Sequence, residues 1–189
     1  GNWAYTEQCL RSIYETKDSQ IADIWVVDDK SKDQTLTNLK RKFPQVKLIA
    51  NKENFGFLRS CNYAFEHLCK NYDWIFLLNN DTEVTNGFLT KSLQLALRDD
   101  RIALVGSKLL FEDGSLQEAG GIFWKSGNAW NFGRGQNPKL RIFNVSRKVD
   151  YCSGAALLLK SRALVEVGYF SEEFLPAYCE DSDLAFKLR

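Results

Sequence analysis

The chain changes from apolar to polar within nine residues, Trp74-Ile75-Phe76-Leu77-Leu78-Asn79-Asn80-Asp81-Thr82. Five consecutive apolar residues are typical of a strand that is buried on both faces, as in a parallel sheet covered by helices. The polar residues that follow end the strand and place one carboxylate at its carboxyl end. Because open α/β sheets bind ligands at this edge, the stretch predicts both a fold class and the location of a site.

Apolar strands and amphipathic helices alternate on both sides of this stretch. We expect further strands near residues 24–27, 46–50, 102–105 and 155–159. Apolar residues at helical spacing predict helices near residues 4–16, 33–43, 57–70, 87–98 and 161–167, and a last one from residue 180. This order predicts an α/β fold with a mostly parallel, doubly wound sheet that is flanked by helices.

Residues 108–150 have a different character, with many glycines and aromatic residues and weak periodicity. We expect them to form a smaller lobe. Trp124 and Trp130 allow two interpretations here. They stack on a sugar, since aromatic faces pack against carbohydrate C–H groups, or they form the core of this lobe.

Composition limits the classes of ligand. The chain has 25 Lys and Arg against 24 Asp and Glu, so it has no broad basic field for nucleic acid. Its five cysteines are scattered without a C-x-x-C pair, which favours reduced thiols and a cytoplasmic location. No apolar run approaches the roughly 18 residues that span a bilayer. We therefore expect any association with the inner face of the membrane to come through parts outside this chain.

Acidic residues follow two of the predicted strands. Asp28 and Asp29 come directly after residues 24–27, and Asp81 follows residues 74–78. Carboxylates at this edge suit a nucleotide with a bound Mg2+ or Mn2+, which takes one or two carboxylates together with the phosphates of its substrate. The alternative is that Asp28 and Asp29 only begin a loop and cap a helix.

Six blocks of sequence, in this order, resemble family 2 inverting glycosyltransferases with the GT-A fold. They are Val26-Val27-Asp28-Asp29-Lys30-Ser31, Asn51-Lys52-Glu53-Asn54-Phe55-Gly56-Phe57, Leu77-Leu78-Asn79-Asn80-Asp81-Thr82, Glu118-Ala119-Gly120-Gly121, Ser153-Gly154-Ala155 and Glu180-Asp181-Ser182-Asp183-Leu184. The resemblance covers nearly the whole chain and is strongest to rhamnosyltransferase-like enzymes of bacterial surface polysaccharide synthesis.

The resemblance implies a role for residues in both halves of the chain. Those that contact the nucleotide would be Asp28, Asp29, Asn54, Arg59, Asn79 and Asn80. Asp81 would bind the metal. Asn79 stands where the commoner Asp-x-Asp form has its first acid, so Asp81 carries the charge alone.

The last block would carry the reaction. Inverting transfer requires a base that takes the proton of the acceptor hydroxyl, and Asp181 matches the base of the family. Glu180 and Asp183 lie in the same turn, so the assignment is uncertain by one residue. Together with Gly154 they are expected to bind the acceptor. The alternative is an acidic first turn that only complements the helix dipole.

Together these features predict an enzyme, a hexosyl- or deoxyhexosyltransferase. Its donor would be a UDP- or dTDP-sugar, and its acceptor a saccharide or a lipid-linked saccharide. We expect one catalytic domain over residues 1–189, with a nucleotide-binding half (1–107) and an acceptor-binding and catalytic-base half (108–189). Because the chain lacks Met and ends within a predicted helix, we expect it to be a fragment. The alternatives are a nucleotidyltransferase and a non-catalytic domain that binds nucleotide-sugars or glycans.

Overall fold

The computed structural model describes residues 1–189 and begins with two helix–strand units. Helix α1 (Trp3–Glu15) and the short 3-10 helix η1 (Lys17–Gln20) lead to β1 (Trp25–Asp28), and α2 (Thr35–Lys42) leads to β2 (Lys47–Ala50). β1 and β2 pair in parallel, with Trp25 opposite Lys47 and Asp28 opposite Ala50. Asp33 accepts hydrogen bonds from the backbone N–H groups at the start of both helices, at 2.8 to 3.1 Å. The N-terminal elements are therefore held together at one point.

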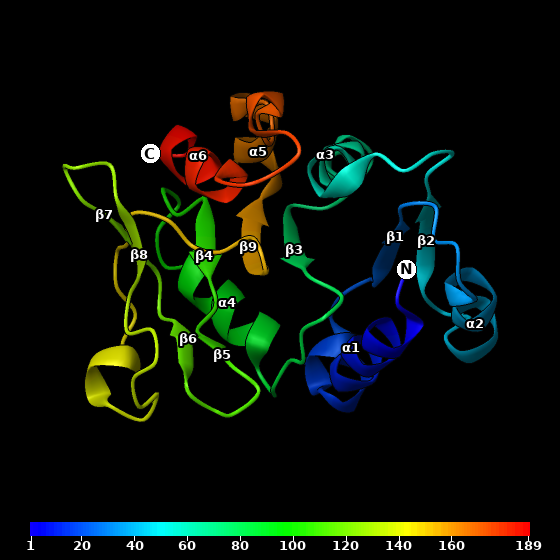
Figure 1. The fold of residues 1–189 in the computed structure, drawn as a ribbon, viewed down its shortest axis with the longest axis horizontal. Coiled ribbons are helices and arrows are strands. Elements are labelled where there is room, and N and C mark those ends of the chain that lie inside the picture. Colours follow the sequence, from blue (N-terminus) through cyan, green and yellow to red (C-terminus); the bar gives the residue numbers. More distant parts are fainter.

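A second sheet contains β3 (Trp74–Leu78), β9 (Ala156–Lys160) and β4 (Leu104–Gly106). β9 lies between the other two strands and runs antiparallel to both (Figure 1). Its three leucines are fully buried. Leu157 and Leu159 face a cluster on one side of the sheet, and Leu158 faces another on the opposite side. A continuous apolar run is required here because both faces of β9 are covered.

Helices cover both faces of this sheet. On one side α3 (Gly56–Leu68), α5 (Ser161–Val167) and α6 (Glu180–Lys187) contribute to the larger cluster, and on the other side α4 (Phe88–Ala96) packs against β4 and β9. The α/β fold predicted from the alternation is confirmed. The strand pairing also shows that β9 is antiparallel to its neighbours, and that it follows β4 in the sequence only after the residues between Gly106 and Ala156.

The two sheets are not hydrogen-bonded to each other. They are joined by α1, because Cys9, Leu10 and Ile13 form a cluster that also takes in Val26 of β1 and Leu78 of β3. None of the helices combines the length and the apolar character that a crossing of the bilayer requires.

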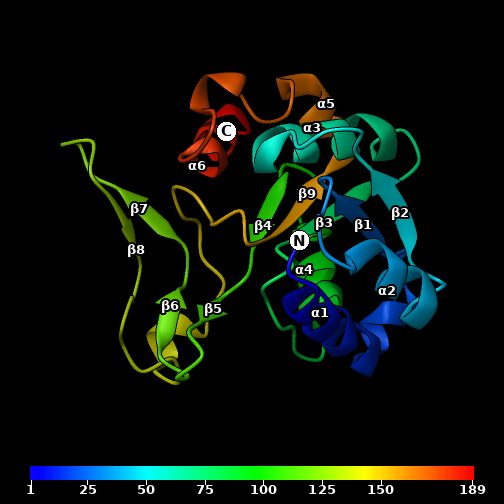
Figure 2. The same ribbon diagram turned by 45° about the vertical axis from the view of Figure 1, so that its right-hand side comes forward.

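Residues 108–150 form a lobe beside the second sheet (Figure 2). It consists of β5 (Leu109–Leu110) paired with β6 (Leu116–Glu118), β7 (Gly121–Phe123) paired with β8 (Ala129–Asn131), and a 3-10 turn, η2 (Arg141–Phe143). Gly133 has φ 81° and lies so close to Leu116 and Phe143 that a Cβ would sit 2.5 Å from either side chain. The lobe thus packs through aromatic and glycine contacts rather than through long elements. A last 3-10 turn, η3 (Glu172–Phe174), precedes α6.

Candidate functional site

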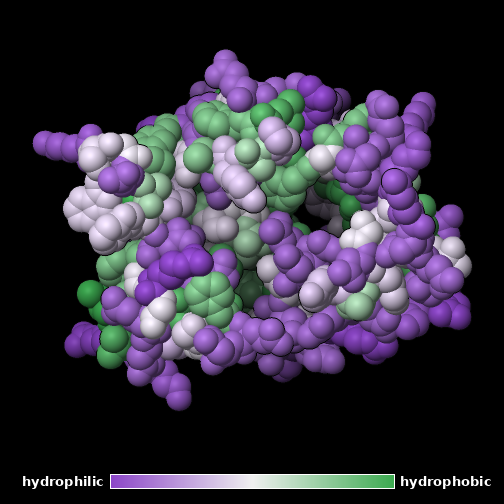
Figure 3. Space-filling model, in the orientation of Figure 1, coloured by the Kyte–Doolittle hydropathy of each residue, from purple (hydrophilic) through white to green (hydrophobic).

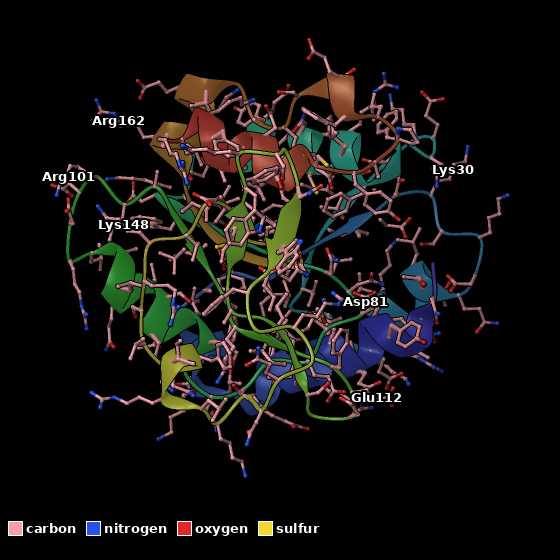
Figure 4. The ribbon with its side chains drawn as sticks, turned by 60° about the vertical axis from the view of Figure 1, so that its left-hand side comes forward. Lys30, Asp81, Arg101, Glu112, Lys148 and Arg162 are labelled. Atoms are coloured by element: carbon pink, nitrogen blue, oxygen red, sulfur yellow. The ribbon has the colours of Figure 1, made fainter.

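The loop after β3 presents Asp81 to solvent. The Asn79 backbone carbonyl accepts hydrogen bonds from the Thr82 N–H at 3.3 Å and its hydroxyl at 2.7 Å, which closes a tight turn. Asn80 is fixed from outside the turn, since its Nδ2 donates to Thr6 Oγ1 of α1 at 2.9 Å. Asp81 itself is exposed, and its carboxylate makes no hydrogen bond or ion pair with the protein. The turn therefore aims one unpaired carboxylate outward beside α1 (Figure 4).

The charge of Asp81 acts on the thiol of Cys9 in α1. Burial raises the pKa of this thiol to about 11, and the negative charge of Asp81 contributes to the rise. No group of three or more acidic, cysteine or histidine side chains is arranged as a metal cage anywhere in the chain. A single free carboxylate nevertheless fits Mg2+ or Mn2+, because these ions bind through one or two carboxylates plus substrate phosphates.

The end of β1 supports the start of α3. Asp29 accepts hydrogen bonds from the N–H groups of Phe55 at 2.7 Å and Gly56 at 2.8 Å, and from Asn51 Nδ2 at 2.9 Å. Burial opposes ionisation of Asp29, but these hydrogen bonds outweigh it, so its pKa is lowered. Asn54 donates to the Asp29 carbonyl at 3.2 Å. Asp29 therefore orders this loop, and both of its carboxylate oxygens are already engaged by the protein.

The other nucleotide-binding candidates differ in accessibility. Asp28 is buried and accepts a hydrogen bond from the Ser31 N–H at 3.2 Å. Arg59 is exposed and pairs with Glu172 at 3.0 Å. An exposed pair of this kind contributes little to stability, so Arg59 is free to exchange Glu172 for a ligand.

Asp181 lies in the first turn of α6, and its carboxylate is fixed by backbone N–H groups. Oδ2 accepts from the Gly154 N–H at 3.0 Å, and Oδ1 accepts from the Ser182 N–H at 2.7 Å. The Ser182 hydroxyl adds a longer contact with Oδ1 at 3.3 Å. A carboxylate has about four acceptor sites, so the side chain is oriented and still has room for one more donor.

Residues 154 and 155 connect the two acidic regions. The Gly154 N–H binds Asp181, and the carbonyl of the next residue, Ala155, accepts the Asn79 N–H at 2.9 Å. Phe57 at the start of α3 also approaches this point, 3.9 Å from where a Cβ on Gly154 would lie. The carboxyl end of β3, the start of β9 and the starts of α3 and α6 therefore meet.

The neighbours of Asp181 face elsewhere. Glu180 is buried, and its Oε2 has no hydrogen-bond partner. Burial, with a smaller effect of this carboxylate, raises the pKa of Cys61 in α3 to about 12. Asp183 accepts from Ser171 Oγ at 2.6 Å and lies 3.7 Å from Lys187 Nζ. Of the three acids in this turn, only Asp181 contacts Gly154.

Glu118 was assigned no role from the sequence, although it lies in one of the six blocks. It is 1% exposed, and its Oε1 accepts from the Ser153 N–H at 2.9 Å. Burial raises its pKa, and the nearby Asp181 charge acts in the same direction. Consecutive N–H groups, of Ser153 and Gly154, therefore bind two different carboxylates. The only signal for Glu118 in the sequence is a charged residue in the block Glu118-Ala119-Gly120-Gly121; in the structure it ends the three-residue strand β6.

Known proteins resemble the chain in sequence and in fold. The model for "Glycosyl transferase family 2" matches residues 1–168. N-acetylglucosaminyl-diphospho-decaprenol L-rhamnosyltransferase from two strains of Mycobacterium tuberculosis is 25% identical over 97% of the chain. The chain spans 66% of the length of these curated relatives.

Solved structures resemble the chain over its full length. One is the mannosyltransferase PcManGT from Pyrobaculum calidifontis in complex with GDP-Man and Mn2+, with a TM-score of 0.70 and 19% sequence identity. The match covers 100% of this chain and 49% of the PcManGT chain. Another is GalNAc-T7 with UDP, GalNAc and Mn2+, with a TM-score of 0.71 and 14% sequence identity. The match covers 99% of this chain and 38% of the GalNAc-T7 chain. These likenesses show the GT-A fold, and the match over residues 1–168 shows that the chain belongs to glycosyl transferase family 2.

Proposed function

We propose that the chain transfers a sugar from a nucleoside-diphosphate sugar to a saccharide or lipid-linked saccharide, with inversion at the anomeric carbon. One observation carries this proposal. The backbone at Gly154 and Ala155 hydrogen-bonds both to Asp181 and to the turn that presents Asp81. An oriented carboxylate and a free carboxylate are thereby held on one short framework, at the edge of the sheet where nucleotides bind.

The donor would lie across the ends of β1 and β3. Asn54 and Arg59 are exposed and would line the side of the nucleoside and diphosphate, whereas the buried Asp28 would contact the donor only where β1 ends. Asn79 and Asn80 would lie in the turn next to the donor. Asp81 would hold Mg2+ or Mn2+, which supplies positive charge to the departing diphosphate when bound. The structural neighbours were solved with Mn2+ and with GDP-Man or UDP, which supports this kind of donor.

Asp181 would act as the base. As the acceptor oxygen bonds to the anomeric carbon, its proton passes to the Asp181 carboxylate, and the bond between that carbon and the diphosphate oxygen breaks with its electrons on the diphosphate. The N–H groups of Gly154 and Ser182 hold the carboxylate in place for this step. Positioning and proton removal together are typical contributions of a general base.

The names of the curated relatives suggest the identity of the substrates. These proteins are named for L-rhamnosyl transfer to an acceptor that carries a diphosphate and a decaprenyl lipid. We propose a UDP- or dTDP-hexose or deoxyhexose as donor and a lipid-linked saccharide of surface polysaccharide synthesis as acceptor. A screen of UDP-, dTDP- and GDP-sugars by thermal shift, with and without Mn2+, selects the donor class.

The test is transfer from the selected donor to a short lipid-linked saccharide, followed by NMR of the product. We expect metal-dependent formation of a glycoside whose anomeric configuration is opposite to that of the donor. A product with the configuration of the donor would contradict the inverting mechanism. A donor that binds and is neither transferred nor hydrolysed would favour a non-catalytic binding domain.

A further inference from the structure

Positive charge is concentrated in one segment of the lobe, residues 119–149. The whole chain is nearly neutral, at +1, but residues 119–149 contain six Lys and Arg and no Asp or Glu. All six side chains are exposed: Lys125, Arg134, Lys139, Arg141, Arg147 and Lys148. The rest of the chain is therefore net acidic, so this charge belongs to one region rather than to the surface in general.

The same region exposes large apolar side chains. Trp124, directly after β7, and Trp130, in β8, are 50% and 64% exposed, with ring centroids 5.9 Å apart. Around η2, three aliphatic residues are also about half exposed: Leu140, Ile142 and Val145. Of the two interpretations of the tryptophans, a place in the core of the lobe does not agree with this exposure. Exposed tryptophan beside basic residues is characteristic of surfaces that enter the interface of a bilayer.

The hairpin and the η2 segment form one unit. Phe132, after β8, packs edge to face on Phe143 of η2 at 5.2 Å, and the Arg147 guanidinium lies 4.4 Å from the Phe132 ring. Both segments lie along the same edge of the molecule (Figure 1), where hydrophobic and hydrophilic residues alternate (Figure 3). We call residues 122–148 the basic–aromatic surface.

A shallow cavity at this surface is suited to an anionic group. It measures about 250 Å³ and is lined in part by Ile122, Phe132, Arg147, Lys148 and Arg189. Arg189 is already paired at 2.6 Å with Asp150, which also lines the cavity. Arg147 donates to the Ile142 carbonyl but, like Lys148, has no acidic partner, so these two cations keep their charge unpaired. The cavity therefore offers an apolar wall and two cations, a combination that matches the head group and upper acyl chain of an anionic phospholipid.

The surface is attached directly to the catalytic region. Gly121 exchanges backbone hydrogen bonds with the segment at 150–151, at 2.8 and 2.9 Å, and that segment continues to Gly154. Phe123 packs edge to face on Phe186 of α6 at 5.2 Å. Because α6 begins with Asp181 and its neighbours, the orientation of the surface fixes the orientation of the site.

We propose that the basic–aromatic surface docks the protein on a bilayer that contains anionic phospholipid. Lysine and arginine would contact the head groups, while the tryptophans and the η2 side chains would enter the interface. Docking would bring a lipid-linked acceptor to Asp181 in a fixed orientation, a consequence that rests on the proposed function. The docking itself does not depend on the proposed function. It would place membrane association within this chain rather than in parts outside the chain.

Co-sedimentation with vesicles tests the proposal. The protein is mixed with vesicles of phosphatidylcholine alone or with 30% phosphatidylglycerol, a composition chosen as roughly that of a strongly anionic surface. We expect binding only to the anionic vesicles, weakened by salt. The variant K139E/R141E reverses two cations that make no side-chain hydrogen bond or ion pair, and should lower the partition coefficient at least 25-fold, at about fivefold per lost cation.

The matched control is K17E/K40E, which changes the net charge equally at two exposed, unpaired lysines of η1 and α2. It should bind vesicles like the wild type. W124A/W130A should weaken binding while leaving its salt dependence in place, and circular dichroism checks that this variant is folded. Equal losses for K17E/K40E and K139E/R141E would overturn the proposal, because they would show that only net charge matters.

Other outcomes also count against docking. No binding to anionic vesicles overturns it, and so does salt-sensitive binding to a homopolymeric RNA without vesicle binding, which would assign the surface to nucleic acid. Transfer to a water-soluble acceptor separates the two proposals. Wild-type transfer to that acceptor without vesicle binding rejects docking alone, and vesicle binding without any transfer rejects the proposed function alone.

Discussion

The turn after β3 and the first turn of α6 each present an aspartate, but the two side chains differ in their hydrogen bonds to the protein. Asp81 is exposed and has no partner in the protein. Asp181 is held by two backbone N–H groups at 2.7 and 3.0 Å. A carboxylate that is to meet an incoming cation gains from being unpaired, whereas a base must be oriented before its substrate arrives. The contrast suggests which acid binds and which removes the proton.

The largest effect is expected for Asp181→Asn. The amide still accepts a hydrogen bond from Gly154 but cannot take a proton, so turnover should fall about 10³-fold, the usual range for a general base. The donor should bind as before. Steady-state transfer and donor titration measure the two quantities, with Glu166→Gln, an exposed and unpaired acid on α5, as the control. A loss of less than tenfold would show that another group removes the proton.

Asp81→Ala should have the next largest effect, on the order of a 100-fold loss of transfer. An ion that stabilises the charge of the leaving group is worth several kcal/mol, and each 1.36 kcal/mol is tenfold in rate. The loss should be partly overcome by higher Mn2+ concentration. Transfer at the wild-type rate with the same dependence on Mn2+ would remove Asp81 from the metal site.

Gly154→Ala should act on the Asp181 side alone. Its backbone does not have positive φ, and the new methyl carbon would lie 3.7 Å from the Asp181 Cβ, an ordinary contact. The fold should therefore be unaffected. The methyl group would lie 3.9 Å from Asp181 Oδ2, where it would crowd the acceptor beside the base and lower turnover about tenfold. Thermal unfolding and transfer kinetics check this pair of results. Weaker binding of the donor with normal turnover would place Gly154 in the other half of the site.

The smallest effect concerns Glu118. Its pKa is raised in the folded protein, so the folded state holds the proton more tightly than the unfolded state, and stability should fall as pH rises from the ordinary carboxyl pKa through the raised one. Glu118→Gln keeps an acceptor for the Ser153 N–H and removes the charge. Urea unfolding at several pH values should show a smaller decline for the variant. An unchanged decline would mean that other groups cause it.

Most helices and strands outside residues 108–150 could be predicted from the sequence, because a long segment with periodic apolar residues can be buried in only a few ways. Strand β3 was predicted at its observed bounds, and α5 within the same residues. In contrast, β5 to β8 have only two or three residues each, too few for a period of two to stand out from the glycines between them. The antiparallel entry of β9 was also missed, since an apolar run alone does not fix strand direction.

The candidate site stays a prediction, and the sequence indicated its residues but not their contacts. The order of the blocks singled out Asp81 and Asp181, but not the hydrogen bonds that distinguish them, which join residues 27 positions apart in the case of Asp181 and Gly154. The role of Asp29 in fixing the start of α3 depends on contacts of the same kind. Glu118 was assigned no role because its partner, Ser153, is 35 positions away.

The most direct test of the contrast is the thermal stabilisation that the cognate nucleoside diphosphate gives with and without Mn2+, measured in the wild type, Asp81→Asn and Asp181→Asn. We predict that the Mn2+-dependent part of the shift is present in the wild type and Asp181→Asn and is lost in Asp81→Asn. A shift that survives in Asp81→Asn and disappears in Asp181→Asn would contradict the account, because it would exchange the roles of the two acids.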